Sequence, residues 1–374
     1  MELVPLLQRL VAIESTSSRS NVEVIDALEE VVSGLGFETR RLDWRDPEGP
    51  EKTNLLCRRG PDAPGGLVLV GHTDCVPFDP NWAEALSGTV RDGRVYGRGT
   101  ADTKGFIASA VVAAARTRPM AKPLHLWFTS DEEVGCAGAK MILADGRARP
   151  AHAIVGEPTS LVPIRAHKGY CIVDVTVTGL EGHSAFPEVG ASAIHAAGQL
   201  LAEVDRIALE MKDDRDAHFD PPFTTFNVGL IHGGKARNIL AGECTFSLEW
   251  RPIPGQDPER ALHLFDAAAE EVAKRCGKGI TVRRTPLRLD VAAVTRPEAP
   301  LVRFLEGESG ARAQTSPFGT ELPELLALGA EGCVFGPGDI RVAHRTGEHV
   351  EIADLERCAS ILERGMLRFC REDL

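Results

Sequence analysis

The stretch LHLWFTSDEEVGC, residues 124–136, joins an apolar run that is typical of a buried strand to three consecutive acids, Asp131, Glu132 and Glu133. Adjacent carboxylates repel one another, and burial would remove the water that stabilises their charge. The acids therefore form either a solvated turn or one wall of a site that also holds positive charge. In an open α/β sheet such a site lies beyond the carboxyl ends of the strands.

The first 160 residues alternate helical and strand patterns around this stretch. Strand-like apolar runs occupy residues 54–57, 67–70, 124–128 and 153–155, and helical periodicity occupies residues 1–11, 22–36 and 105–116. This alternation predicts an α/β domain in which helices flank a twisted, mostly parallel sheet. The same kind of pattern returns near residue 287 and ends in a helix over residues 352–370.

A different pattern fills the middle of the chain. Strand, helix, strand, strand, helix and strand are expected at residues 171–177, 191–207, 225–231, 243–251, 258–276 and 280–284. That order is the ferredoxin-like β-α-β-β-α-β arrangement. We therefore predict a catalytic domain formed by residues 1–169 and 286–374, interrupted by an inserted ferredoxin-like lid or dimerisation domain at residues 170–285.

Composition limits the possible partners and the compartment. The formal net charge of −12 argues against a general nucleic-acid or anionic-membrane surface and suits a small-molecule substrate. No uncharged stretch is long enough to span a bilayer, and the N-terminal residues lack the basic start of a signal peptide. The nine cysteines include no Cys-x-x-Cys pair, so we expect reduced thiols in a cytoplasmic protein.

Polar residues follow several of the expected strands in turn. They are His72, Asp74, Asp102, the acids at residues 131–133, and Glu157. Imidazole and carboxylate ligands without cysteine suit divalent ions such as zinc, cobalt or manganese, and so many acids are better matched by two ions than by one. Taken singly, each residue also has an ordinary explanation as a hydrogen-bonded pair or a solvated side chain.

Six motifs in series resemble the M20 family of metallopeptidases and deacylases. They are GHTDCVP (71–77), GRGTADTKG (97–105), TSDEEVGCAGAK (129–140), GEPTS (156–160), GHSAFPE (182–188) and GPGDIRVAH (336–344). The resemblance covers nearly the whole chain and implies two metal ions, Zn²⁺ or Co²⁺. It assigns the ligands in this order: His72 and Glu157 to one ion, Glu133 and His344 to the other, and Asp102 as the bridge. His349 is the alternative to His344.

The resemblance also implies catalytic roles. Asp74 would orient the imidazole of His72, and Glu132 would act as the general base and pass a proton to the departing amine. His183 would stabilise the developing oxyanion, from its own subunit or from a neighbouring one. The Asp102-Thr103 peptide is a candidate for the cis form. Asp131 receives no role beyond a turn or a cap.

Substrate contacts follow from matching positions in the family. Arg251 and Asn238 would hold the substrate carboxylate, and Lys168, Gly319 and Thr320 occupy further matching positions. Without the resemblance, Arg251 would be interpreted as part of a surface salt bridge and His183 as a loop residue.

The segments IHGGKARN, RPIPG and SPFGTE are most similar to the acetylornithine deacetylase branch of the family. This similarity implies hydrolysis of N2-acetyl-L-ornithine to ornithine and acetate, a step of arginine biosynthesis, by a homodimer. Glu321 could attract the cationic side chain of that substrate, or it could be an exposed loop residue.

Three alternatives stay open at this point. The first is a sibling deacylase or dipeptidase acting on acetyl-citrulline, acetyl-lysine, succinyl-diaminopimelate or another N-acyl amino acid. The second is a binding protein that has kept the fold without the activity. The third is a thiol hydrolase that uses Cys75 or Cys136.

Overall fold

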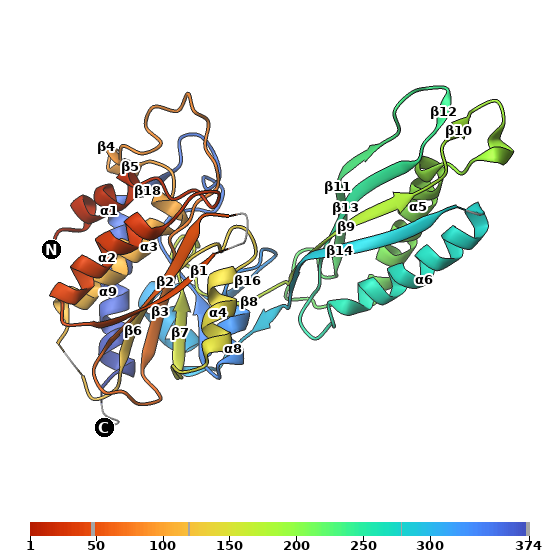
Figure 1. The fold of residues 1–374 in the computed structure, drawn as a ribbon. Helices are drawn as coiled ribbons and strands as arrows, with labels where there is room; N and C mark the ends of the chain where they lie inside the picture. Colours follow the sequence, from red (N-terminus) through yellow and green to blue (C-terminus); the bar gives the residue numbers. More distant parts are fainter. Residues whose placement is uncertain (46–48, 119, 278, 372–374) are drawn as a thin grey trace. The chain divides into compact units, whose positions relative to one another are not determined.

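The computed structural model describes residues 1–45, 49–118, 120–277 and 279–371 (Figure 1). The chain divides into two compact units. Unit 1 comprises Met1–Arg165, Thr295–Gln314 and Thr320–Leu374, and unit 2 comprises Ala166–Val294 and Thr315–Gly319. Unit 2 extends beyond the expected residues 170–285 because strand β14 (Thr281–Asp290) continues past residue 285.

A mixed sheet with the strand order β1-β2-β6-β3-β7-β17-β8 forms the centre of unit 1. Its strands are β1 (Glu38–Arg45), β2 (Glu51–Arg59), β3 (Leu67–His72), β6 (Leu124–Thr129), β7 (His152–Val155), β8 (Ile164–His167) and β17 (Glu331–Val334). The last two residues of β8 pair with β15 (Ala293–Val294) and belong to unit 2, and β16 (Gln314–Ser316) also pairs with β8.

The four central strands, β6, β3, β7 and β17, are parallel to one another. At the edges, β2 is antiparallel to β6, β1 is antiparallel to β2, and β8 is antiparallel to β17. The predicted α/β fold is confirmed, with a sheet that is mixed at its edges. Only residues 46–50 separate β1 from β2, and so short a connection cannot make the crossover that parallel strands need.

Helices cover both faces of this sheet (Figure 1). One face packs against α1 (Leu3–Ala12), α2 (Val22–Gly34), α3 (Gly105–Arg116), α7 (Pro300–Ser309) and α9 (Ile352–Phe369) in a single hydrophobic core. Helices α4 (Ala137–Asp145) and α8 (Leu322–Ala327) contact each other on the other face. The Ala-rich α3 is buried from Gly105 to Ala114, as its uncharged sequence predicts.

A short kinked segment, η1 (Thr100–Lys104), leads into α3. Its backbone is non-helical at Asp102 and Thr103, and the Asp102-Thr103 peptide is cis, as expected. Close to it lies a small antiparallel sheet with the order β18-β5-β4. Its strands are β4 (Thr89–Arg91), β5 (Arg94–Tyr96) and β18 (His349–Glu351).

Unit 2 has the expected β-α-β-β-α-β order. Its elements are β9 (Tyr170–Thr178), α5 (Ala193–Met211), β11 (Thr225–Gly233), β13 (Glu243–Arg251), α6 (Glu259–Cys276) and β14, in an antiparallel sheet ordered β11-β13-β9-β14. Alternate residues of β9 from Cys171 to Val177 are fully buried in the core shared with α5 and α6. The short strands β10 (Gly182–His183) and β12 (Ile239–Leu240) pair beside the turn η2 (Pro187–Val189).

None of the helices within the described ranges combines the length and the apolar character that crossing a membrane requires.

Candidate active site

The polar residues predicted to meet at the carboxyl ends of the strands do meet there in unit 1. His72 is the last residue of β3, the acids at residues 131–133 follow β6, and Glu157 follows β7. Because β3, β6 and β7 are parallel neighbours, these positions share one edge of the sheet. Asp102 reaches the same place from η1.

Asp102 contacts both predicted histidine ligands. Its Oδ1 lies 3.0 Å from Nε2 of His72, and its Oδ2 lies 3.0 Å from Nε2 of His344. Nε2 of His344 also lies 3.1 Å from Oε1 of Glu133. Asp102 thus turns one oxygen to each of the two predicted ligand imidazoles.

Two groups of candidate donor atoms share His72, and within each group the atoms lie within 4.8 Å of one another. The first group is His72, Asp102 and Glu133, and the second is His72, Glu132 and Glu157. Imidazole nitrogens and carboxylate oxygens at this density fit a site for divalent ions of the zinc, cobalt or manganese type. His344 completes the first group from the C-terminal part of the chain.

The electrostatics of the cluster also favour cations. Burial, together with the charges of Asp102 and Glu132, holds the pKa of Glu157 well above its usual range. Burial and Asp102 raise the pKa of Glu133 as well. Hydrogen bonds to Asp102 and Glu133 raise the pKa of His344 to about 10. The cluster thus carries more acid than its histidines neutralise, and divalent ions would remove the repulsion.

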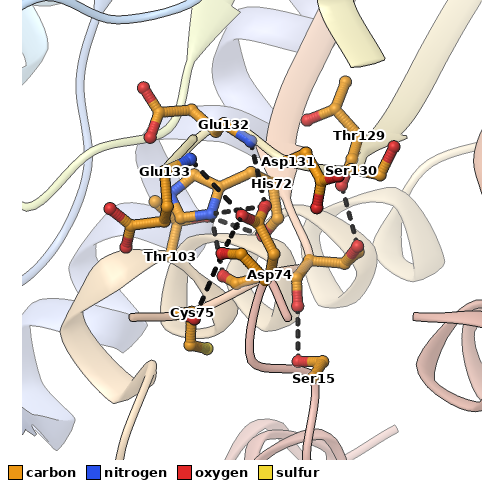
Figure 2. Close-up of polar contacts among 12 residues, drawn as sticks. Ser15, His72, Asp74, Cys75, Thr103, Thr129, Ser130, Asp131, Glu132 and Glu133 are labelled. Atoms are coloured by element: carbon orange, nitrogen blue, oxygen red, sulfur yellow. Dashed lines mark hydrogen bonds and ion pairs between the residues drawn. The ribbon is translucent and has the colours of Figure 1, made fainter. Parts of the chain in front are cut away.

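Asp74 joins the two segments that carry the ligands (Figure 2). Nδ1 of His72 lies 3.0 Å from the main-chain oxygen of Asp74 and 3.6 Å from its carboxylate. The carboxylate also accepts the main-chain N–H groups of Glu132, at 3.1 Å, and Glu133, at 3.3 Å. Asp74 therefore contacts the imidazole through both its main-chain oxygen and its carboxylate. Its carboxylate also holds the main chain of the acidic loop, a contact that sequence reasoning missed.

Asp131 has a defined partner. Its Oδ1 lies 2.6 Å from Nζ of Lys52, and both side chains are buried. Asp131 adopts a left-handed backbone conformation with φ of 54°. The ion pair neutralises one of the three consecutive acids and leaves Glu132 and Glu133 to face the ligand cluster. No local sequence signal links Lys52 to a residue 79 positions away.

The alternative ligand His349 lies in β18, where its Nδ1 is 2.9 Å from the main-chain oxygen of Gly347 and its ring packs 5.0 Å from that of Tyr96. His344 is the histidine that contacts Asp102 and Glu133.

Glu321 is buried and accepts a hydrogen bond from the hydroxyl of Thr129 at 3.0 Å, so the expectation of an exposed loop residue is wrong. Burial raises its pKa to about 8. Thr320 beside it is also buried, and its hydroxyl accepts the N–H of Leu322 at the start of α8.

The two candidate thiols are poorly suited to nucleophilic catalysis. Cys75 and Cys136 are buried, and burial raises the pKa of Cys75 to about 11, so this thiol is protonated at neutral pH. Sγ of Cys136 lies 3.5 Å from Oε1 of Glu132.

Four of the predicted catalytic and substrate residues, and Gly319, belong to unit 2. His183 in β10 is exposed, and its Nδ1 accepts the N–H of Ala185 at 3.1 Å. Asn238 lies on the adjacent segment, where its main-chain oxygen accepts the N–H of Ser184 at 3.1 Å. His183 and Asn238 therefore lie on two neighbouring segments of unit 2, which pair through β10 and β12.

Arg251 and Lys168 lie in a second part of unit 2. The guanidinium of Arg251 stacks 3.8 Å from the ring centroid of Tyr170 and pairs with Glu249 at 2.9 Å. Lys168 is buried and donates to the main-chain oxygen of Phe223 at 2.6 Å. Burial and the charge of Arg251 lower the pKa of Lys168.

Residues 68–368 match the family described as peptidase family M20/M25/M40. The chain belongs to this family. It is 48% identical over 367 residues to an acetylornithine deacetylase of Myxococcus xanthus, which covers 97% of this chain and 96% of the relative. An acetylornithine deacetylase of Proteus mirabilis is 35% identical over 389 residues, covering 98% and 96% of the two chains.

Solved structures of M20-type enzymes share the fold. A tripeptidase from Staphylococcus aureus superposes with a TM-score of 0.78 at 21% identity, covering 97% of this chain and 96% of that one. An M20 family metallo-carboxypeptidase from Sulfolobus solfataricus gives a TM-score of 0.76 at 16% identity, with 98% of both chains covered.

Proposed function

We propose that the protein is a metal-dependent amide hydrolase that removes the acetyl group from N2-acetyl-L-ornithine, giving L-ornithine and acetate. One observation carries the choice of substrate, the 48% identity to an acetylornithine deacetylase across 97% of the chain. The matched region spans residues of both units. The proposed role is the corresponding step of arginine biosynthesis, in the cytoplasm.

The proposed metal ligands are His72, Asp102, Glu133, Glu157 and His344, whose side chains gather in unit 1. When bound, two Zn²⁺ or Co²⁺ ions would supply Lewis acidity and lower the pKa of the attacking water.

Glu132 is the proposed general base. Its carboxylate lies near His72 and Glu157 but outside the group that contains Glu133 and Asp102. As the base it would take a proton from the attacking water and return it to the nitrogen of the departing amine. Asp74 fixes the main chain of this residue through a 3.1 Å hydrogen bond, so the base is preorganised.

The proposed substrate contacts come mainly from unit 2. Arg251 would bind the substrate carboxylate with its guanidinium fork, which Tyr170 and Glu249 already hold in place. Asn238 would add a contact to the same carboxylate. His183 would donate a hydrogen bond to the developing oxyanion, within one subunit or across a homodimer. Lys168, Gly319 and Thr320 are the further proposed substrate contacts.

A sibling activity is the second candidate, supported by the TM-score of 0.78 to a tripeptidase. Metal-loaded protein incubated with N2-acetyl-L-ornithine should release free amine faster than with acetyl-citrulline, acetyl-lysine, succinyl-diaminopimelate or dipeptides. Faster turnover of another compound in this panel would reject N2-acetyl-L-ornithine as the substrate, but the protein would still be an amide hydrolase.

The division of labour between the paired glutamates is tested separately. Glu132→Gln should abolish turnover and keep bound metal, whereas Glu133→Gln should lose metal as well. Glu23→Gln, an exposed position on α2, is the control and should behave as the wild type. Equal metal content in the Glu132 and Glu133 variants would contradict the assignment.

A further inference from the structure

Glu348 is a fully buried carboxylate next to the candidate metal cluster. Its Oε1 accepts two main-chain N–H groups, from Ala101 at 3.0 Å and from Asp102 at 3.2 Å. Its Oε2 accepts a hydrogen bond from the guanidinium of Arg98. Both carboxylate oxygens are thus committed to the segment that carries the proposed bridging ligand.

The main chain of Glu348 is tied to the same region. Its carbonyl accepts the N–H of Gly97 at 3.0 Å, and its own N–H donates to the carbonyl of Arg345 at 3.2 Å. Arg345 directly follows His344, so Glu348 ends the turn that presents this histidine. The turn and residues 97–102 are therefore connected through both the backbone and the side chain of Glu348.

Arg98 extends the connection to the segment that follows His72 and Asp74. Its guanidinium donates to the carbonyl of Pro77 at 3.4 Å and stacks 5.5 Å from the ring centroid of Trp82. Its main-chain N–H donates to the carbonyl of Ala85 at 2.7 Å. The pair formed by Arg98 and Glu348 therefore contacts parts of the chain next to three proposed ligands, His72, Asp102 and His344.

We propose that Glu348 is a positioning residue that holds the backbone at Asp102 and the turn of His344 in the one arrangement in which both ligate the same ion. The inference rests on the proposed metal-dependent function. Two imidazoles reach a shared carboxylate at 3.0 Å, so a small displacement of the Asp102 backbone would separate them. Hydrogen bonds behind metal ligands fix the direction of the ligating atoms, and removing them typically weakens metal binding about 10–100-fold.

The two oxygens of Glu348 have different partners, so two substitutions separate their effects. Glu348→Gln keeps an oxygen for the N–H groups of Ala101 and Asp102 and turns an amide donor toward Arg98, which removes the ion pair. Glu348→Met has a side chain of similar length that accepts no hydrogen bond from the main chain or from Arg98. It therefore leaves the buried N–H groups of Ala101 and Asp102 without this acceptor. Glu351→Ala in β18 is the matched control, because that acid pairs with Arg94 at the surface.

The readouts do not depend on turnover. Zn²⁺ affinity is measured by competition with a fluorescent chelator, ligand geometry by the visible absorption of the Co²⁺-loaded protein, and folding by thermal unfolding of the metal-free protein. We expect Glu348→Met to bind Zn²⁺ at least about tenfold more weakly and to have an altered cobalt spectrum. Glu348→Gln should keep the affinity and spectrum of the wild type despite a lower melting temperature, and Glu351→Ala should match the wild type in all three measurements.

Wild-type affinity and an unchanged spectrum in Glu348→Met would overturn the inference, since Glu348 would then serve folding alone. Should that variant fail to fold, Glu348→Asp decides, because its carboxylate is one methylene shorter and is withdrawn from the N–H groups of Ala101 and Asp102. Zn²⁺ binding at least about tenfold weaker in Glu348→Asp supports the inference, and wild-type affinity with an unchanged cobalt spectrum overturns it. Failure of the proposed function is seen separately, as a wild-type protein that binds neither Zn²⁺ nor Co²⁺ or that releases no ornithine.

Discussion

The buried ion pair between Lys52 and Asp131 gives the sharpest test of how the acidic loop is held. The two charged atoms lie 2.6 Å apart, and the side chains are 3% and 7% exposed. Nζ of Lys52 also donates to the main-chain oxygen of Ser17 at 2.6 Å. Lys52→Met removes the cation and leaves the carboxylate buried beside the negative cluster, so the free energy of unfolding should fall by about 3–5 kcal/mol.

Asp131→Asn should reduce the free energy of unfolding by about 1–3 kcal/mol, because the amide oxygen can still accept from Lys52. Asparagine also tolerates the left-handed backbone at this position. In the Lys52→Met background the same substitution removes a buried charge that has lost its ion pair with Lys52, and it should raise stability. The sign of the second substitution therefore reverses between the two backgrounds.

The assay is urea unfolding of metal-free protein followed by tryptophan fluorescence. Three of the four tryptophans, Trp44, Trp82 and Trp127, belong to unit 1, so a Trp250→Phe background confines the signal to the unit that holds the pair. Arg9→Met, which breaks an exposed pair on the same unit, is the control and should change stability by less than about 1 kcal/mol. If Asp131→Asn destabilises both backgrounds equally, the pair is not coupled and the argument fails.

The remaining predictions concern metal, thiols and pH. EDTA should abolish turnover and added Zn²⁺ or Co²⁺ should restore it; activity that survives exhaustive chelation would exclude the proposed mechanism. Cys75→Ala and Cys136→Ser should retain most of the activity, since neither thiol is the nucleophile, and loss of turnover in a folded, metal-loaded variant would restore the thiol mechanism. Burial and the charge of Arg58 lower the pKa of His125 to about 4. Between pH 6.5 and 4, His125 is therefore protonated in the unfolded chain but neutral in the folded chain. The free energy of unfolding should therefore fall by about 3 kcal/mol as the pH drops through this window, and His125→Gln should not show this decrease. Identical pH profiles of urea unfolding for the wild type and His125→Gln would refute the prediction.

Much of the fold follows from periodicity. Runs such as residues 67–70 and 124–128 predict β3 and β6, because buried parallel strands need apolar side chains on both faces. The antiparallel edges of the large sheet were not predicted, because strand order and direction depend on which elements pack together. The C-terminal boundary of the inserted domain was also predicted too early, at residue 285. Strand β14 continues to Asp290, but its sequence carries Arg283, Arg284 and Arg288 and does not alternate regularly after residue 284.

Sequence order was sufficient to bring the candidate ligands to one edge of the sheet. His72 and Glu157 follow parallel strands, and the position of each is fixed by the few residues before it. The partners of these residues were not foreseen. Lys52 pairs across 79 positions, and Glu348 reaches the N–H of Asp102 across 246.

The acids at residues 131–133 show which features could be predicted from the sequence and which depend on the tertiary structure. The sequence by itself determined that three carboxylates follow a buried strand and that one imidazole and further carboxylates lie at the ends of neighbouring strands, because strand ends and side-chain chemistry are local properties. Only the tertiary structure decided that Lys52 neutralises Asp131 and that Asp74 holds the main chain of Glu132 and Glu133. Burial makes any unpaired charge or N–H group costly, so each partner is chosen by what the folded chain places within hydrogen-bonding distance.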